Sequence, residues 1–199
     1  MKQAVCKLIT VAMLGSAAPT LLAADTGALV RGVVQVGASY RGDPLRVATN
    51  AQGRPVHIDG VGKLQLGLGA EWTAGQLPLT VRLLLSHDID KSARVDDGPR
   101  ASFVRTPLEA TAYYTGLDGI RFGVSLGYVF SPTADVTVDG QERSVNFKNA
   151  MSKAFEIGYR FHPNLWGSLR LSAATYQPKV AGGVKSDVTH LAVSMAYSF

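Results

Sequence analysis

Eight segments of this chain alternate between apolar and polar residues at every second position, and this period of two constrains the fold more than any other feature. The segments are residues 29–40, 61–72, 79–87, 103–114, 120–130, 155–161, 168–173 and 190–199. Between Ile120 and Phe130, for example, every even-numbered residue is apolar, and the odd-numbered ones include arginine, glycine and serine. Successive side chains of a β-strand point to opposite faces. We therefore predict eight strands, each with one apolar and one polar face.

The lengths of the connections indicate what these strands form, because alternation alone also occurs in soluble sheets. The connections 41–60, 88–101, 131–152 and 177–187 are long and polar, whereas 73–78, 115–119 and 162–165 are short. Outer-membrane barrels have long extracellular loops and short periplasmic turns. In hydrocarbon every backbone N–H and C=O needs a partner, so membrane-spanning strands must close into a barrel. We predict an all-β fold, an eight-stranded antiparallel up-and-down transmembrane β-barrel, with a lipocalin-like soluble barrel as the alternative.

Aromatic residues gather near the ends of the predicted strands. Those near the short connections are Trp72, Tyr114, Phe161, Trp166, Tyr197 and Phe199, and those near the long ones are Tyr40, Phe103, Phe130 and Tyr176. Aromatic rings anchor membrane barrels at both membrane–water interfaces. We therefore expect two aromatic belts, one at each end of the barrel.

The start of the chain has the composition of a secretory signal peptide. Two lysines precede or adjoin the apolar residues 8–18, and small residues end the segment at Ala24. We predict cleavage after Ala24, which divides the chain into a signal peptide (1–24) and an outer-membrane β-barrel domain (25–199). A buried N-terminal helix is the alternative. The single cysteine, Cys6, lies in the removed segment, so the mature chain has no thiol for a disulfide or a metal site.

The predicted mature chain resembles the family of small bacterial outer-membrane β-barrels that includes the OmpA membrane domain, OmpX and OmpW. The resemblance lies in the strand count, the loop pattern and the terminal VSMAYSF of residues 193–199. It implies export across the inner membrane into the outer membrane of a Gram-negative bacterium. Tyr197 and Phe199 are similar to the C-terminal sorting signal of this family, which implies that the barrel-assembly machinery binds the last strand. The resemblance also implies contact with outer-membrane lipids and lipopolysaccharide, and we expect a monomer.

Charged residues gather on the polar faces of the predicted strands, which face the barrel lumen. They are Arg31, Lys63, Glu71, Arg82, Arg105, Glu109, Arg121, Glu156, Arg160 and Arg170. An eight-stranded barrel is just wide enough for side chains to fill it, and charges there need partners. We expect Glu71 close to Arg82 and Arg121. We expect Glu109 within reach of Arg105 or Arg121. Two interpretations stay open: a paired core that fixes strand register, or a narrow path in which surplus arginines favour anions.

A lipid-modifying enzyme would need a nucleophile and an acid–base partner near the outer leaflet. The best candidate is His87, but the adjacent Ser86 points to the opposite face of the same strand, so the two cannot share one site. His190 is predicted to face the lumen as a hydrogen-bonding residue. The four aspartates of the connection 88–101 lack the spacing of a calcium-binding EF-hand. We therefore predict no catalytic residue, no cofactor and no metal site.

The function that the sequence favours is that of a non-enzymatic structural or surface-interaction protein of the outer membrane, with its long loops facing the exterior. The chain has 20 Lys and Arg against 15 Asp and Glu without any basic run, so we expect no nucleic-acid partner. Arg41, Arg46 and Arg54 of the first long connection could meet lipopolysaccharide phosphates. The alternative function is a narrow passive channel for small solutes, similar to OmpW. A lipid-modifying enzyme is the third and least favoured interpretation.

Overall fold

The computed structural model describes residues 29–43, 45–49, 55–58, 63–92, 101–138, 141–180 and 185–199. The predicted signal peptide, its cleavage after Ala24 and Cys6 lie outside the described residues. The same holds for Arg54 and for the side chains of Tyr40, Arg41, Arg46 and Lys63. Within the described ranges, no helix is long and apolar enough to cross a membrane.

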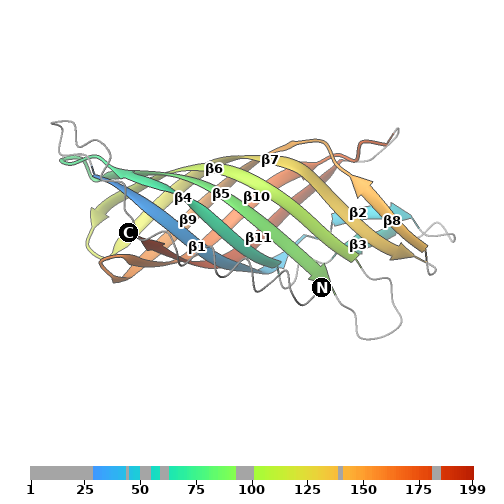
Figure 1. The fold of residues 1–199 in the computed structure, drawn as a ribbon, viewed down its shortest axis with the longest axis horizontal. Helices are drawn as coiled ribbons and strands as arrows, with labels where there is room; N and C mark the ends of the chain where they lie inside the picture. Colours follow the sequence, from blue (N-terminus) through green and yellow to red (C-terminus); the bar gives the residue numbers. More distant parts are fainter. Residues whose placement is uncertain are drawn as a thin grey trace.

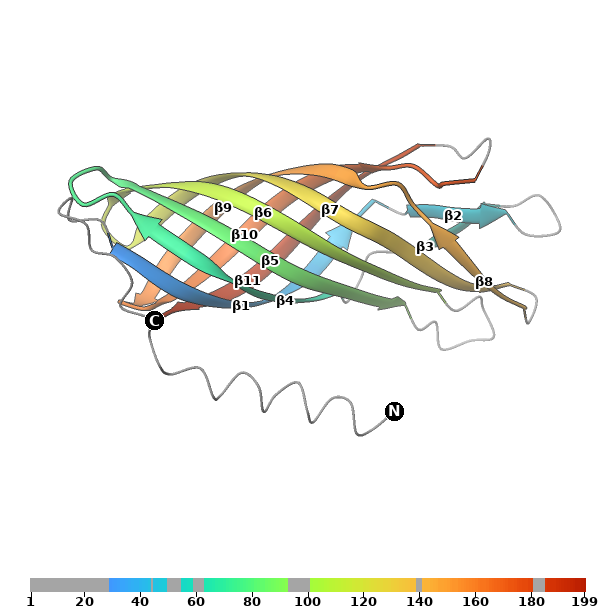
Figure 2. The same ribbon diagram turned by 45° about the horizontal axis from the view of Figure 1, so that its top comes forward.

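Eight long antiparallel strands close into a barrel, which Figures 1 and 2 show from two directions. They are β1 (Leu29–Gly42), β4 (Lys63–Thr73), β5 (Leu79–Ser92), β6 (Ala101–Leu117), β7 (Ile120–Val138), β9 (Ala150–His162), β10 (Leu165–Tyr176) and β11 (Ser186–Ser198). Each pairs with the barrel strands before and after it in the chain, and β1 pairs with β11 to close the ring. The predicted eight-stranded up-and-down barrel is therefore confirmed. The short connections between β4 and β5, β6 and β7, and β9 and β10 lie at the end where the C-terminus lies (Figure 1).

Three further strands lie within the connections predicted to be long polar loops. β2 (Leu45–Thr49) and β3 (Pro55–Ile58) form a separate two-stranded sheet, and β8 (Gln141–Asn146) pairs with the last part of β7. Figure 2 shows all three at the end of the barrel opposite the C-terminus. The long-connection end therefore carries protruding β-structure.

β7 continues to Val138, although the alternation predicts that it ends at Phe130. The alternation is interrupted there because the buried positions change from odd to even numbers. Odd-numbered positions are buried up to Val129, and even-numbered ones are buried from Pro132 to Val136. Ser131, with a φ of 39°, lies at the change. The strand pairs with β9 before this point and with β8 after it. A pattern with a single phase cannot follow such a strand.

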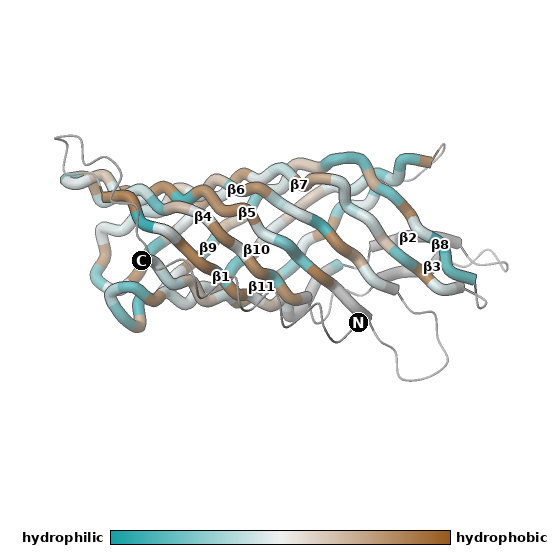
Figure 3. The backbone as a smooth tube through the Cα atoms, in the orientation of Figure 1, coloured by the Kyte–Doolittle hydropathy of each residue, from teal (hydrophilic) through white to brown (hydrophobic). Residues whose placement is uncertain are grey.

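The apolar faces of the barrel point outward and its polar faces point inward. On β5, Leu83 and Leu85 are 51% and 50% exposed, whereas Arg82 is 1% exposed. The same alternation of apolar and polar residues runs along the other barrel strands in Figure 3. A soluble protein does not expose so large an apolar surface, whereas a barrel in hydrocarbon requires one. The arrangement therefore excludes the soluble barrel that the sequence left as an alternative.

The predicted aromatic belts are correct in part. At the short-connection end, Trp72, Tyr114, Phe161, Tyr197 and Phe199 are exposed on the outside, as is Phe130 near the other end. The prediction is wrong for Phe103 and Tyr176, which are buried on the lumen side, and for Trp166, whose ring lies against the lumen residue Arg121. These three rings share the strand faces that carry buried polar residues, and a place near a strand end does not determine the face.

Candidate functional site in the barrel lumen

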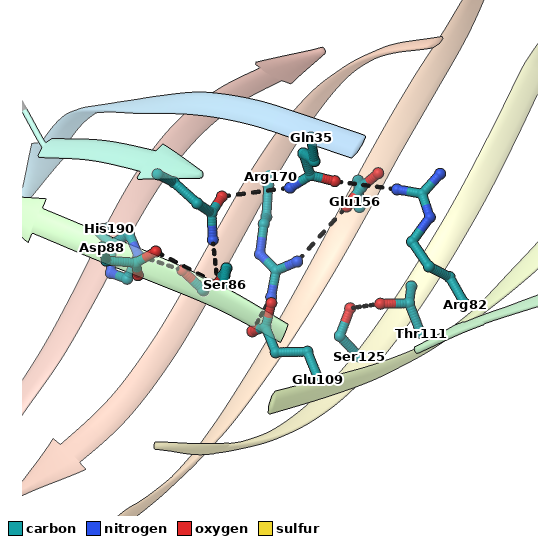
Figure 4. A network of polar contacts seen from close by, with 12 residues as sticks. Gln35, Arg82, Ser86, Asp88, Glu109, Thr111, Ser125, Glu156, Arg170 and His190 are labelled. Atoms are coloured by element: carbon teal, nitrogen blue, oxygen red, sulfur yellow. Dashed lines mark hydrogen bonds and ion pairs between the residues drawn. The ribbon is translucent and has the colours of Figure 1, made fainter. Parts of the chain in front are cut away.

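Among the described residues, the lumen contains equal numbers of buried cationic and anionic side chains. The cations are Arg82, Arg105, Arg121 and Arg170, and the anions are Glu71, Asp88, Glu109 and Glu156. None of these residues is more than 7% exposed. Figure 4 shows part of this network, with side chains from several strands meeting in the interior. Four charges of each sign balance among the described lumen residues, so this buried set carries no surplus of arginine.

Glu71 is the acceptor for two arginines near the short-connection end of the lumen. Arg82 Nε and Nη2 both donate to Glu71 Oε2, at 3.1 and 2.7 Å, and Arg121 Nη1 donates to the same oxygen at 3.4 Å. Glu71 and Arg82 are directly opposite each other on β4 and β5, which explains the two-point contact. The structure thus gives Glu71 both of the partners expected for it.

Arg121 is enclosed between two aromatic rings. Its guanidinium carbon lies 4.1 Å from the centre of the Tyr113 ring and 4.2 Å from that of Trp166. The guanidinium carbon of Arg82 lies 4.9 Å from the centre of the same Tyr113 ring. The Tyr113 hydroxyl donates to Glu156 Oε1 at 2.9 Å. Such contacts stabilise desolvated cations by about 2 kcal/mol. The prediction missed Tyr113, although its odd position on β6, the same as that of Arg105 and Glu109, places it in the lumen.

Glu109 pairs with Arg170 and not with the expected Arg105 or Arg121. Arg170 Nη2 donates to Glu109 Oε1 at 2.5 Å, and Arg170 Nη1 lies 3.6 Å from Glu156 Oε2. Two strands separate β6 from β10 in the sheet, so this pair crosses the lumen. Sequence pattern gives the face of each residue but not which residues meet across a barrel, and the partner of Glu109 could not be predicted for that reason.

A second polar cluster surrounds Arg105 nearer the long connections. Arg105 Nε donates to Asp88 Oδ2 at 2.7 Å, another nitrogen donates to the Tyr176 hydroxyl, and Nη2 lies 3.2 Å from His190 Nε2. The Ser172 hydroxyl lies 2.7 Å from the same ring nitrogen. His190 is thus a lumen hydrogen-bonding residue. Asp88, predicted to begin a loop, is instead a buried residue of β5, because the inward face of that strand continues beyond Ser86.

Amide and hydroxyl groups connect the two charged clusters. Arg82 Nη1 donates to Gln35 Oε1 at 3.1 Å, and Gln35 Nε2 donates to Gln65 Oε1 at 3.3 Å. Gln65 Nε2 donates to the Ser86 hydroxyl at 3.2 Å, and that hydroxyl donates to Asp88 at 3.4 Å (Figure 4). Because residues of every barrel strand take part, a slip in register at any strand would break the network. The arrangement therefore fixes the register of the barrel.

An apolar cluster is buried at the long-connection end, between β6, β7, β9 and β10. It consists of Phe103, Val129, Ala134, Val136, Phe147, Ala150, Ala174 and Tyr176, each at most 6% exposed. The rings of Phe103, Phe147 and Tyr176 meet edge to face, with centroids 5.4 to 6.2 Å apart. Sequence patterning missed this cluster because much of it lies beyond the phase change at Ser131.

Arg31 and Arg160, also predicted for the lumen, lie at its margin. Arg160 is at the short-connection rim, where its side chain is 42% exposed and Nη2 donates to Asp118 Oδ1 at 2.5 Å. Arg31 is half-buried, opposite Glu71 in the register of β1 and β4. Part of the surplus of cations that the sequence predicts for the lumen therefore lies at the rim of the barrel.

The structure separates Ser86 and His87, the pair considered for catalysis. His87 is exposed on the outer face, with Nδ1 3.2 Å from the Thr106 hydroxyl, whereas Ser86 is buried in the lumen, so the two do point to opposite faces. No group of three or more His, Cys, Asp and Glu side chains that could hold a metal ion occurs in the described ranges.

Several solved structures share the fold of this chain. Neisserial surface protein A (NspA) has a TM-score of 0.56 at 10% identity, over 87% of this chain and 99% of that one. Ail, the attachment invasion locus protein of Yersinia pestis, has a TM-score of 0.54 at 13% identity, over 87% and 99%. The N-terminal β-barrel domain of Pseudomonas aeruginosa OprF has a TM-score of 0.51 at 14% identity, over 86% and 100%. No protein-family model and no curated protein matches this chain. The likeness establishes the fold, which is that of the small eight-stranded outer-membrane β-barrels.

Proposed function

We propose that this chain is an integral, non-enzymatic protein of the bacterial outer membrane with a structural or surface-interaction role. Its barrel is sealed and holds the long loops outside the cell. The observation that carries the proposal is the filled lumen, in which four buried arginines balance four buried carboxylates under an apolar cluster.

The lumen pairs support a barrel that does not conduct. An ion or solute could pass only if guanidinium and carboxylate groups separated, and leaving a buried charge without its partner costs about 3–5 kcal/mol. The four buried arginines are balanced by four buried carboxylates, so this described set has no net positive charge to attract an anion. In this proposal the apolar cluster around Phe103, Phe147 and Tyr176 is a second barrier to water at the long-connection end. The alternative, a narrow passive channel for small solutes, needs both layers to open.

We also propose how the chain reaches the outer membrane. Residues 1–24 act as a signal peptide that is cleaved after Ala24, and the barrel-assembly machinery recognises the last strand through Tyr197 and Phe199. The mature protein is surrounded by outer-membrane lipids and lipopolysaccharide. It is a monomer, because every barrel strand is paired on both sides, so the barrel wall offers no strand edge to a second copy.

The test uses the full chain, expressed in a Gram-negative host and extracted in folded form from the separated membranes. Outer-membrane fractions should contain the protein, its N-terminal residue should be Asp25, and it should migrate faster on gels before heating than after. The extracted barrel is then inserted into a planar bilayer under salt, and current is recorded. We expect a silent membrane. Reproducible unitary current steps that change when Arg82, Arg121 or Glu109 is replaced would overturn the sealed barrel in favour of the channel.

A further inference from the structure

We infer that three lysines on the outer face of β9 and β10, and of the segments that continue them, bind the phosphate groups of an outer-leaflet glycolipid of the lipid A type. This lysine stripe consists of Lys148, Lys153 and Lys179, all exposed. The inference rests on the proposed function, because it takes the long-connection end of the barrel to face the cell exterior.

Lys153 lies in the lipid-facing surface of the barrel. Its partners in register are Leu126 on β7 and Ala173 on β10, and Leu126 is 67% exposed. Its outward neighbours along β9, Met151 and Phe155, are 62% and 46% exposed. Lysine on the lipid face costs about 2–4 kcal/mol at the bilayer midplane and about 0–1 kcal/mol near an interface. Because Lys153 is the fourth residue from the loop end of β9, its long side chain can bring the ammonium to that interface.

Tyr128 marks where the interface runs. Its ring is 39% exposed on the outer face, opposite Met151 in register, and its hydroxyl accepts a hydrogen bond from Asn149 Nδ2 at 2.9 Å. Tyrosine rings lie at membrane interfaces with the ring in the apolar layer and the hydroxyl toward water. The headgroup region therefore begins beside Lys153.

Lys148 and Lys179 continue the stripe beyond the barrel wall. Lys148 N donates to Gln177 O at 2.8 Å, and Lys179 N donates to Asn146 O at 2.8 Å, so the two lysines lie on adjacent backbone segments. Each follows a buried residue, Phe147 or Pro178, and therefore points outward.

The ammonium groups of the stripe have no carboxylate partner in the described part of the chain. Lys148 Nζ donates to the amide oxygen of Gln177 at 3.4 Å. The carboxylate that flanks the stripe on β11, Asp187, accepts a hydrogen bond from the Thr175 hydroxyl at 2.6 Å. Cations held at headgroup level without a carboxylate partner are complementary to lipid phosphates. A diphosphorylated glycolipid fits three lysines better than a zwitterionic lipid does.

The test measures how strongly the folded chain retains lipid A. Full-length protein extracted from membranes is placed in phosphatidylcholine vesicles that contain a minor fraction of diphosphorylated lipid A, and the lipid that copurifies is quantified by native mass spectrometry. We expect the triple variant K148Q/K153Q/K179Q to retain lipid A about a hundredfold less well, because each lysine contributes about 1 kcal/mol and 1.4 kcal/mol is tenfold. An excess of inorganic phosphate should not displace the lipid.

A matched control separates this site from general attraction of basic residues. Arg143 on β8 is exposed and pairs with the buried Val136, so it shares the inward face of the sheet and points away from the lysine stripe. Arg143→Gln should therefore leave the retention of lipid A within twofold. If the triple variant does not fold, the single variant Lys153→Met replaces it, because methionine keeps an apolar side chain toward the lipid. It should lower the retention of lipid A about fivefold, which corresponds to the loss of about 1 kcal/mol. Lys153→Arg should restore it.

The outcomes distinguish this inference from the proposed function. A heat-modifiable, silent barrel whose wild-type and triple-variant forms retain lipid A equally would overturn the lysine stripe and leave the sealed barrel standing. An equal loss in Arg143→Gln, or displacement by inorganic phosphate, would also overturn it. Unitary current steps with selective retention of lipid A would overturn the sealed barrel and leave the stripe.

Discussion

The ring of Phe199 lies directly on Gly32 where the last barrel strand closes on the first. Gly32 N donates to Phe199 O at 3.0 Å, and Phe199 N donates to Gly32 O at 2.9 Å. A Cβ at Gly32 would lie 2.6 Å from both Cε2 and Cζ of Phe199, so only glycine leaves room for the ring. Phe161 covers Gly167 on the neighbouring strands in the same way. An aromatic ring over a strand glycine replaces the packing that the missing side chain would supply.

Gly32→Ala should displace the Phe199 ring and lower the free energy of unfolding by about 1–3 kcal/mol, since overpacking of a close contact has this cost. Phe199→Ala should also destabilise the barrel, because it uncovers the glycine. The double variant should lose less than the sum of the two, since the alanine methyl then occupies the space that the ring has left. Urea unfolding from vesicles gives the three values. Strictly additive losses would contradict a direct contact between the two residues.

Glu156→Gln should destabilise the barrel strongly, although glutamine has nearly the same shape as glutamate. Glu156 is 1% exposed and lies within 3.8 Å of Arg121 and 3.6 Å of Arg170, so the variant leaves two buried guanidinium groups with less compensation. We expect the free energy of unfolding to fall by about 3–5 kcal/mol. Asp118→Asn at the exposed rim pair is the control and should have no measurable effect. Equal, small effects of both changes would mean that water screens the lumen charges.

The sequence predicts the barrel far better than the contacts within it. Alternation fixes the face of each residue, and the register opposite Glu71 explains why Arg82 could be chosen as its partner. The pair of Glu109 and Arg170 depends on how the barrel curves, which no local pattern records. Asp88 falls in a predicted loop because the connection 88–101 is polar, yet the ion pair with the buried Arg105 keeps it within β5. The apolar cluster stayed hidden because the phase of β7 changes at Ser131.

Exchanging the charges of Glu109 and Arg170 tests that cross-lumen pair. Glu109→Arg alone and Arg170→Glu alone each bury two like charges, and we expect losses of about 3–5 kcal/mol in the free energy of unfolding. The double exchange reverses the pair, so it should recover at least about half of the summed loss. Heat-modifiable gel migration checks that each variant forms a barrel. No recovery in the double variant would indicate that other partners, such as Glu156, determine the cost.

Phe147→Ala tests whether the charged layer alone seals the barrel. Phe147 is fully buried against Phe103 and Tyr176, so the truncation should cost about 3–5 kcal/mol and admit water beneath the loops. Hydrogen exchange should then rise in the backbone around residues 101–105 and 174–178 and stay unchanged around Arg121, because the ion pairs below are intact. The planar bilayer should remain silent. Current steps in this variant would mean that the apolar cluster, and not the arginine–carboxylate network, closes the lumen, and that the network itself can pass ions.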